Sequence, residues 1–294
     1  ITILRDGTYI DTKKISETDM NDVVKMMIGR EIGERYPQRN VSIGNRVLEV
    51  KNLTCPGVFE KVSFEVHAGE VLGVSGLMGA GRTETTRAIF GVDPKDSGEF
   101  YVDGKKIEVN CPMDAIRNGV VLAPEDRKKD GLCTKLSIRQ NLALPNLDLV
   151  CNKMGVINSG KEDALCEKAV KDLQIKTPNV EIDSGNLSGG NQQKAIIARE
   201  IDKNPELLIA VQPTRGLDVG AIEHVHKQLV QARDAGKGVL LISLELDEVM
   251  NVSDRILVMY EGEIVGEFDP KKVTVEELGL YMAGSKRKET KSNE

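Results

Sequence analysis

The chain has 294 residues, of which 40% are hydrophobic and 29% charged, with a formal net charge of −6 at pH 7. This is long enough for one large globular domain and an additional segment. The acidic balance and an aromatic content of only 3% argue against a nucleic-acid partner. No apolar run approaches the roughly 18 residues of a membrane span, so we expect any link to a membrane to run through a partner.

Two stretches at opposite ends of the chain resemble each other. Residues 1–7 (ITILRDG) read like residues 256–262 (ILVMYEG), and residues 27–29 (MIG) read like residues 282–284 (MAG). Both matches have the same offset, because 262 − 7 = 255 and 284 − 29 = 255. A constant offset indicates an internal repeat. We therefore expect residues 1–30 to be the tail of a preceding copy; a chance match between two strand–turn–helix stretches is the alternative.

The start at Ile1, which is not a methionine and lies inside a strand pattern, favours the same interpretation. Residues 31–45 are polar and contain proline and glycine, which is typical of a linker. Residues 47–50 and 62–66 alternate between apolar and polar, as strands do. Asp103-Gly104 lies between two further short strand patterns and predicts a hairpin with a type I′ turn.

A glycine-rich turn follows the apolar strand expected at residues 69–75 and precedes a helix. Residues 76–83 (GLMGAGRT) fit the phosphate-loop template G-x-x-x-x-G-K-[ST], except that Arg82 replaces the lysine. Backbone N–H groups in such a loop surround phosphate oxygens, and the helix start favours anions. Thr83 offers a hydroxyl to Mg²⁺, whereas Arg82 keeps the charge on a bulkier planar group. We expect weakened phosphate binding, with a ligand-free glycine turn as the alternative.

The residues expected to bind nucleotide in this loop are Gly76, Gly79, Ala80, Gly81, Arg82, Thr83 and Glu84.

The remaining elements predict an α/β fold. Residues 161–175 have helical periodicity, and residues 207–211 and 239–242 are short apolar runs typical of strands buried on both faces. An amphipathic helix separates these two strands. Alternation of strands and helices predicts a parallel sheet covered by helices. Residues 285–294 are charged and are expected to form a frayed tail.

The run 187–194 (LSGGNQQK) is the most specific motif of the chain. Taken alone, it also fits a helix capped by Ser188 with a glycine-rich entry and no ligand. Three further motifs accompany it: the phosphate loop at 76–83, PEDRK at 124–128, and QPTRGLD at 212–218. Together they resemble the ATP-binding-cassette (ABC) ATPases, specifically the second half of tandem sugar-importer ATPases of the ribose/galactoside type.

This resemblance covers residues 46–284 and implies a P-loop NTPase fold of the ABC type. The fold would contain an antiparallel β subdomain and an α-helical subdomain at about residues 134–194. The stretch 212–223, together with 243–248, looks closest to importers of nucleosides or simple sugars.

Four chemical positions depart from the family pattern. The strand before Pro213-Thr214 normally ends in aspartate, which helps to hold Mg²⁺, and glutamate, which polarises the attacking water; here Val211 and Gln212 take these places. Leu244 stands at the usual histidine position. Glu125 stands at the usual glutamine of a nucleotide-contacting loop that senses metal and couples to the membrane partner. The resemblance therefore implies that no catalytic residue is intact in this half, with only weak Mg²⁺ binding at Thr83.

The signature motif, in contrast, is whole. In the family, two halves pair head to tail, so that each ATP lies between the phosphate loop of one half and the signature of the other. The implied signature residues are Leu187, Ser188, Gly189, Gly190, Asn191 and Gln192, and the implied D-loop residues are Gly216, Leu217 and Asp218. Ser188 and the N–H groups of the two glycines would face a γ-phosphate at a helix start, flanked by Asn191 and Gln192.

The resemblance implies the C-terminal half of the ATP-binding subunit of an importer for a simple sugar or nucleoside. Its ligands would be ATP and Mg²⁺. Its partners would be a preceding nucleotide-binding half in the native chain, membrane permease subunits and, indirectly, a periplasmic or lipid-anchored substrate-binding protein, with the chain peripheral on the cytoplasmic side of the membrane. Two alternatives stay open: a regulatory or structural nucleotide-binding module that does not hydrolyse ATP, and a soluble ABC ATPase of DNA repair or translation.

Overall fold

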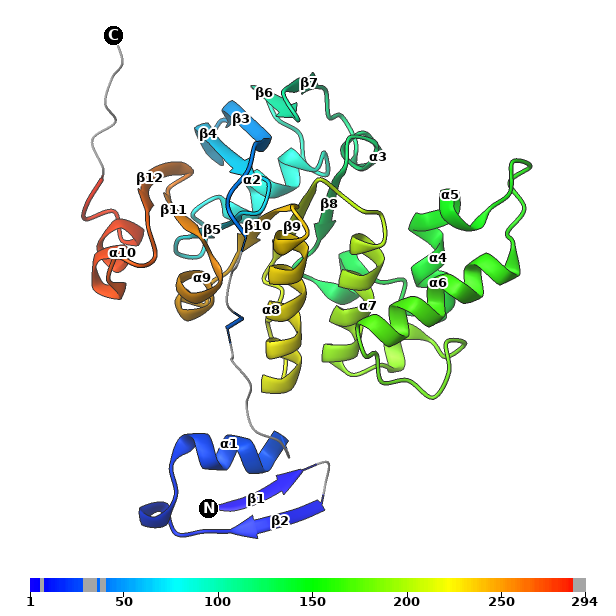
Figure 1. The fold of residues 1–294 in the computed structure, drawn as a ribbon. Helices are drawn as coiled ribbons and strands as arrows, with labels where there is room; N and C mark the ends of the chain where they lie inside the picture. The colour runs from blue at the N-terminus through cyan, green and yellow to red at the C-terminus, as the bar shows by residue number, and fades with distance from the viewer. Residues whose placement is uncertain (6–7, 29–35, 38–40, 288–294) are drawn as a thin grey trace.

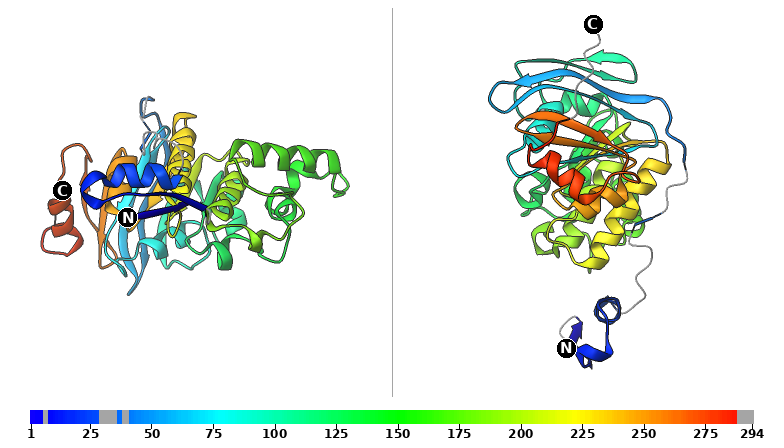
Figure 2. Two further views of the ribbon diagram at one scale, coloured as in Figure 1. Left: turned by 90° about the horizontal axis from the view of Figure 1, so that it is seen from below. Right: turned by 90° about the vertical axis from the view of Figure 1, so that its left-hand side faces the viewer.

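The computed structural model describes residues 1–5, 8–28, 36–37 and 41–287. Figures 1 and 2 show a hairpin–helix unit at the N-terminus, within residues 1–28, that lies apart from the body formed by residues 41–287. Parts of three predicted segments lie outside the described residues: 6–7 and 29–30 of the predicted tail, 31–35 and 38–40 of the predicted linker, and 288–294 of the predicted C-terminal tail. Among the described residues, no helix combines the length and the hydropathy that a membrane span requires.

A six-stranded sheet in the order β12-β11-β5-β10-β9-β8 forms the centre of the body. Its strands are β5 (Val71–Ser75), β8 (Val120–Ala123), β9 (Leu207–Val211), β10 (Gly238–Ile242), β11 (Arg255–Tyr260) and β12 (Glu263–Phe268). Neighbouring strands are parallel, except for the antiparallel pair β11 and β12. Every residue of β5, β9 and β10 is buried, since both faces of the sheet are covered. The predictions of buried strands at 207–211 and 239–242 are confirmed.

The two faces of this sheet belong to two hydrophobic cores. Along β10, Leu240 and Ile242 pack into one core, whereas Val239 and Leu241 pack into the other. This division follows from the alternation of side chains along a strand. The first core includes α2 (Arg82–Ile89), and the second includes α7 (Gly189–Ile201) and α8 (Val219–Asp234).

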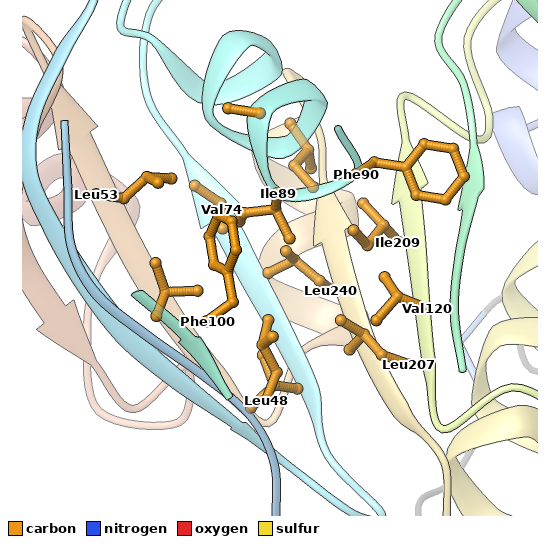
Figure 3. Close-up of a cluster of buried hydrophobic side chains, with 14 of the residues drawn as sticks. Leu48, Leu53, Val74, Ile89, Phe90, Phe100, Val120, Leu207, Ile209 and Leu240 are labelled. Atoms are coloured by element: carbon orange, nitrogen blue, oxygen red, sulfur yellow. The ribbon is translucent and has the colours of Figure 1, made fainter. Parts of the chain in front are cut away.

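A second, antiparallel sheet in the order β4-β3-β6-β7 covers the first core. Its strands are β3 (Arg46–Cys55), β4 (Phe59–His67), β6 (Ser97–Val102) and β7 (Lys105–Ile107), and α3 (Pro112–Arg117) follows. Figure 3 shows Leu53 and Phe100 of this sheet gathered around Ile89 of α2 and Val74 of β5. The predicted hairpin is confirmed: Asp103 and Gly104 both have positive φ, 48° and 73°.

A helical region lies to one side of the parallel sheet, beyond α7 in Figure 1. It contains α4 (Ile138–Ala143), the 3₁₀ turn η3 (Leu144–Asn146), α5 (Leu147–Val150), α6 (Ser159–Asp172) and the 3₁₀ turn η4 (Ser184–Asn186). The predicted helix around residues 161–175 is confirmed as α6. Its Cys166 and Ala169 pack with Ile138 and Leu142 of α4, and burial raises the pKa of the Cys166 thiol to about 11. The body ends with α9 (Leu246–Val252) and α10 (Val275–Met282).

The N-terminal unit repeats the architecture of the C-terminal end. It consists of β1 (Thr2–Arg5), β2 (Thr8–Thr12), the 3₁₀ turn η1 (Ile15–Glu17) and α1 (Met20–Ile28). In the first hairpin Leu4 pairs with Tyr9, and in the second Met259 pairs with Ile264. The offset is 255 for both strands, since 259 − 4 = 255 and 264 − 9 = 255. The register irregularity also falls at the matching step of each hairpin, and α1 begins 255 residues before α10.

Candidate functional site: a phosphate loop and a signature helix

The phosphate loop, residues 76–83, follows β5 and runs into the first turn of α2, with Leu77, Met78 and Gly79 exposed at its tip. Gly76 has φ 155° and Gly81 has φ 88°, a region that disfavours other residues. A Cβ on Gly76 would lie 2.5 Å from the Met259 carbonyl oxygen, and one on Gly81 would lie 2.9 Å from the Val58 carbonyl oxygen. The glycines therefore let the chain turn closely against its neighbours. The resulting loop at a helix start suits a phosphate group.

The guanidinium of Arg82 faces the interior of the protein. The side chain is 6% exposed, its Nη1 donates to the Ser243 carbonyl oxygen at 2.9 Å, and its Nη2 donates to the Leu77 carbonyl oxygen at 3.3 Å. Burial lowers the pKa of Arg82 from its usual value. In this arrangement Arg82 braces the loop against the residue that follows β10.

The surroundings of Thr83 offer few ligands for Mg²⁺. Its Oγ1 lies 3.5 Å from Oε2 of Glu125, and Glu125 is also paired with Arg215. Val211, buried at the end of β9, lines one cavity together with Thr83 and Glu125, and its side chain supplies no oxygen. Mg²⁺ prefers six oxygen ligands in octahedral geometry. Thr83 and Glu125 would supply one oxygen each, with Glu125 already paired with an arginine, so the other ligands would have to be phosphate oxygens and water. Glu84 is exposed in the first turn of α2.

Gln212 holds the position at which the family pattern has the glutamate. Its backbone has φ 49°, its N–H donates to the Ile242 carbonyl oxygen at 2.8 Å, and its side-chain Oε1 accepts from the Leu244 N–H at 3.2 Å. The side-chain amide therefore fixes the backbone at Leu244, whose own side chain is 38% exposed. An amide in this place has no carboxylate with which to take a proton from water.

The signature segment, residues 187–192, forms the start of α7. Ser188 is the N-cap: its exposed Oγ accepts from Asn191 N at 3.4 Å and from Asn191 Nδ2 at 3.0 Å. Leu187 is buried, and Gln192 is buried with its Nε2 donating to the Ser184 carbonyl oxygen at 3.2 Å. The structure thus gives Leu187 and Gln192 interior contacts and leaves Ser188 at the surface.

The D-loop turn, residues 216–218, lies against the signature segment. Asp218 caps α8, because its Oδ1 accepts from Ala221 N at 2.9 Å. A Cβ on Gly190 would lie 2.8 Å from Cβ of Ala221 and 3.5 Å from Oδ2 of Asp218. Only glycine allows α7 and α8 to approach so closely. The signature segment and the D-loop turn therefore pack directly against each other.

Two arginines, Arg127 and Arg215, connect the segment around Glu125 to the turn after β9, a role that the sequence does not predict. Arg127 Nη1 donates to the Arg215 carbonyl oxygen at 2.8 Å, and the Arg215 side chain pairs with Glu125. A cavity of about 900 Å³ borders these residues and extends to Leu144 and Pro145 of the helical region. The motif PEDRK marked this stretch of sequence, but no spacing within it indicates a contact with a segment about 90 residues away.

The chain is similar to ABC proteins in sequence and in fold. A family model described as ABC transporter matches residues 59–215, more than half of the chain. The ribose import ATP-binding protein RbsA of Bacillus subtilis (strain 168) is 46% identical over 286 residues, which are 97% of this chain and 58% of that protein. RbsA of Caldanaerobacter subterraneus subsp. tengcongensis is 45% identical over 284 residues, 96% of this chain and 57% of that protein. The chain therefore spans under three fifths of the length of these relatives.

Two solved structures illustrate the likeness of fold. A nucleotide-free ATP-binding cassette from an ABC transporter has a TM-score of 0.67 and 23% identity, covering 80% of this chain and 98% of the cassette. A dimeric cassette in a post-hydrolysis state, bound to ADP and Pi, has a TM-score of 0.65 and 22% identity, covering 77% of this chain and 100% of that one. The fold is that of an ABC cassette, with an antiparallel sheet and several helices around the α/β core. The chain belongs to the ABC transporter family.

Proposed function

We propose that this chain is the C-terminal nucleotide-binding half of a tandem importer ATPase, and that it lends its signature segment to an ATP held by the preceding half. One contrast carries the proposal. At the chain's own phosphate loop, Arg82 is bound to backbone carbonyls and Gln212 and Val211 replace the two carboxylates. At the signature segment, Ser188 is exposed at a formed helix start.

The tandem arrangement draws support from the two matching hairpins. Residues 1–30 would be the tail of a preceding nucleotide-binding domain, residues 31–45 a linker, residues 46–284 the second domain with its helical subdomain at about 134–194, and residues 285–294 a tail. The common offset of 255 in strand pairing and helix start favours this division. The relatives, of which the chain spans 58% or less, leave room for a first half.

The proposed cargo is a simple sugar, with a nucleoside as the second candidate. The relatives are named for ribose import, which favours a pentose. The proposed partners are membrane permease subunits and, through them, a substrate-binding protein, with the chain peripheral on the cytoplasmic side of the membrane. The 900 Å³ cavity beside Glu125 is a suitable docking place, because the corresponding loop couples to the membrane partner in the family that the sequence resembles.

Binding of ATP at this half's own loop is proposed to be weak. Backbone N–H groups of residues 76–83 and the start of α2 would hold the phosphates. Mg²⁺, which supplies charge neutralisation in phosphoryl transfer, would be held by the hydroxyl of Thr83 and the carboxylate of Glu125 together with phosphate oxygens and water. Four residues at this site, Arg82, Val211, Gln212 and Leu244, give hydrolysis no general base and few ligands.

Titration calorimetry and phosphate release on the 294-residue chain test this part of the proposal. The expected dissociation constant for Mg²⁺-ATP is tens of micromolar or weaker, about −6 kcal/mol. Phosphate release is expected to be near background. Nanomolar binding or brisk turnover by the isolated chain would overturn the assignment of a degenerate site.

ATPase assays of the full-length protein with its permease distinguish the importer proposal from the two alternative functions, a non-hydrolysing module and a soluble ABC ATPase. A non-hydrolysing module would leave the full-length protein without ATPase activity at any permease concentration. A soluble ABC ATPase of DNA repair or translation would hydrolyse ATP without stimulation by a permease. Stimulation by permease and substrate-binding protein in proteoliposomes is the outcome that the importer proposal requires.

A further inference from the structure

We propose that Arg127 is a positioning residue that fixes the signature segment and the D-loop turn to the coupling loop, defined here as residues 124–131. A displacement of the coupling loop would then move the signature as well. The inference rests on the proposed function, because the position of the signature matters for hydrolysis only if that segment contacts an ATP. Its structural part, however, is testable on this chain alone.

The first observation is a reciprocal link between the coupling loop and the turn after β9. Arg127 donates to the carbonyl oxygen of Arg215 at 2.8 Å, while the guanidinium of Arg215 returns to Glu125 of the coupling loop. The turn itself is closed by two backbone bonds, from Arg215 N to the Gln212 carbonyl at 3.1 Å and from Leu217 N to the Thr214 carbonyl at 3.2 Å. Two charge-assisted contacts thus connect segments that are about 90 residues apart in sequence.

The second observation is that the same guanidinium lies against the start of α7. A Cβ built on Gly189 would lie 3.4 Å from Nη2 and 3.7 Å from Cζ of Arg127, and one on Gly216 would lie 3.8 Å from Nη2. One planar group therefore bonds the Arg215 carbonyl and lies beside Gly189 of the signature segment and Gly216 of the D-loop turn. A lysine ammonium, which lacks the two-pronged shape, cannot make the same set of contacts.

The third observation concerns how Arg127 is held. It begins the π-helix η2 (Arg127–Gly131), and the Asp126 carboxylate accepts from Lys128 N and Lys129 N at 3.0 and 3.1 Å. At the other end of η2, the Gly131 carbonyl oxygen accepts from Arg199 Nη1 of α7 at 2.7 Å. π-Helical turns are rare and often mark functional places.

The coupling loop thus meets α7 at both ends of η2: Arg127 lies beside Gly189, and the Gly131 carbonyl bonds Arg199. A Cβ on Gly131 would lie 2.6 Å from Cδ1 of Ile196, so the loop backbone packs directly on the helix. Packed elements of this kind shift as a unit. Arg127 is the member of the attachment that lies beside Gly189, and its loss should release the signature end of α7 while the Arg199 contact keeps the loop in place.

Hydrogen exchange on the 294-residue chain tests the structural part. In Arg127→Ala, the amides of Asn191, Gln192, Arg215 and Leu217 are expected to exchange about tenfold faster, in line with the loss of a charge-assisted hydrogen bond. Lys95→Ala is the matched control, because Lys95 also donates to a backbone carbonyl, that of Gly98, at 3.1 Å in the antiparallel sheet. Unchanged exchange at the four amides in Arg127→Ala would overturn the proposal.

Steady-state ATPase activity of the full-length protein with its permease tests the consequence. Arg127→Ala is expected to lower kcat tenfold to a hundredfold with KM for ATP changed less than about twofold, because the signature is misplaced while the preceding half's phosphate loop is intact. Full recovery by Arg127→Lys would show that charge alone is needed and would overturn the positioning role. Faster exchange with unchanged kcat would leave the structural link standing and contradict the proposed function instead.

Discussion

Arg82 stands where the phosphate-loop template has lysine, and its side chain bonds backbone carbonyls inside the protein. A lysine at this place of the template reaches the phosphates from the loop. The arginine here is longer and planar, and it binds Ser243 and Leu77 through separate nitrogens. Its 6% exposure means that water does not replace these partners easily. We therefore regard Arg82 as a brace between the phosphate loop and the segment that follows β10.

Arg82→Ala should consequently reduce stability more than activity. The variant loses two buried hydrogen bonds from a charged donor, for which about 2–3 kcal/mol is a reasonable cost. We expect urea unfolding of the 294-residue chain to show this loss. Permease-stimulated ATPase activity of the full-length protein should fall only modestly. An Arg82→Ala chain as stable as the wild type would show that the brace is not important.

Val211 is the residue whose replacement should restore a metal site. Val211→Asp would add a carboxylate to the cavity wall that Thr83 and Glu125 share. Calorimetry should then show ATP affinity rising about tenfold between EDTA and Mg²⁺, compared with little change in the wild type. Arg82→Lys and Gln212→Glu added to this variant extend the test toward hydrolysis. An ATP affinity of Val211→Asp that is unaffected by Mg²⁺ would contradict this description of the site.

At the scale of single elements, the ion pair between Arg87 of α2 and Asp93 makes a small, pH-dependent contribution to the free energy of unfolding. Arg87 Nε and Nη2 donate to the two carboxylate oxygens of Asp93 at 2.7 and 2.9 Å, and these bonds hold the pKa of Asp93 below its usual value. Because the pKa of Asp93 is lower in the folded chain than the value of about 3.9 in the unfolded chain, the ion pair stabilises the fold at pH values above about 3.9. This stabilisation is lost as the pH falls through the lower pKa of the folded chain.

Asp93→Asn should therefore destabilise the chain at pH 7 and approach the wild type below pH 3.9. Both side chains are about one third exposed, 33% and 36%, so we expect a difference of only about 0.5 kcal/mol. Urea unfolding across this pH range measures it. Asp172→Asn, at an exposed position of α6, is the control and should change little. A difference between Asp93→Asn and wild type that grows on acidification would be the wrong sign.

The elements that could be predicted from sequence are those whose pattern is local. Strands buried on both faces, such as β9 and β10, read as continuous apolar runs, and the Asp103-Gly104 turn predicts its own hairpin. The glycines of residues 76–81 and 189–190 also stand out in the sequence, because each motif has glycine at fixed spacing. Arg127 was not assigned a role, since its partners Arg215 and Gly189 come together only in the fold.

The left-handed backbone of Gln212 illustrates the same limit. Nothing in the residue type predicts φ 49°, because glutamine rarely adopts this conformation. Hydrogen bonds with Ile242 and Leu244, at the carboxyl ends of β9 and β10, hold Gln212 in this conformation. Long-range hydrogen bonds of this kind leave no periodic signal in the sequence.

For the molecule as a whole, the repeated hairpin–helix unit predicts what the native gene contains. The reading frame before the codon for Ile1 should encode a cassette of similar length that ends in residues 1–30. That cassette should carry lysine in its phosphate loop and an Asp-Glu pair before its own Pro-Thr-like turn, because the proposal places hydrolysis at that cassette's phosphate loop. Sequencing of the native gene answers this directly; a start codon just before Ile1 with no upstream cassette would exclude the tandem.

The central claim is that this half contributes its signature and not its own phosphate loop to hydrolysis. The steady-state ATPase rate of the full-length protein with its permease is the decisive measurement. Gly189→Asp, which adds bulk and negative charge beside Ser188, should lower the rate a hundredfold or more, and Ser188→Arg should do the same. Gln212→Ala should retain activity within about threefold of the wild type, because its amide accepts from the Leu244 N–H and supplies no carboxylate. If Gln212→Ala is as damaging as Gly189→Asp, this half's own site is catalytic and the account is wrong.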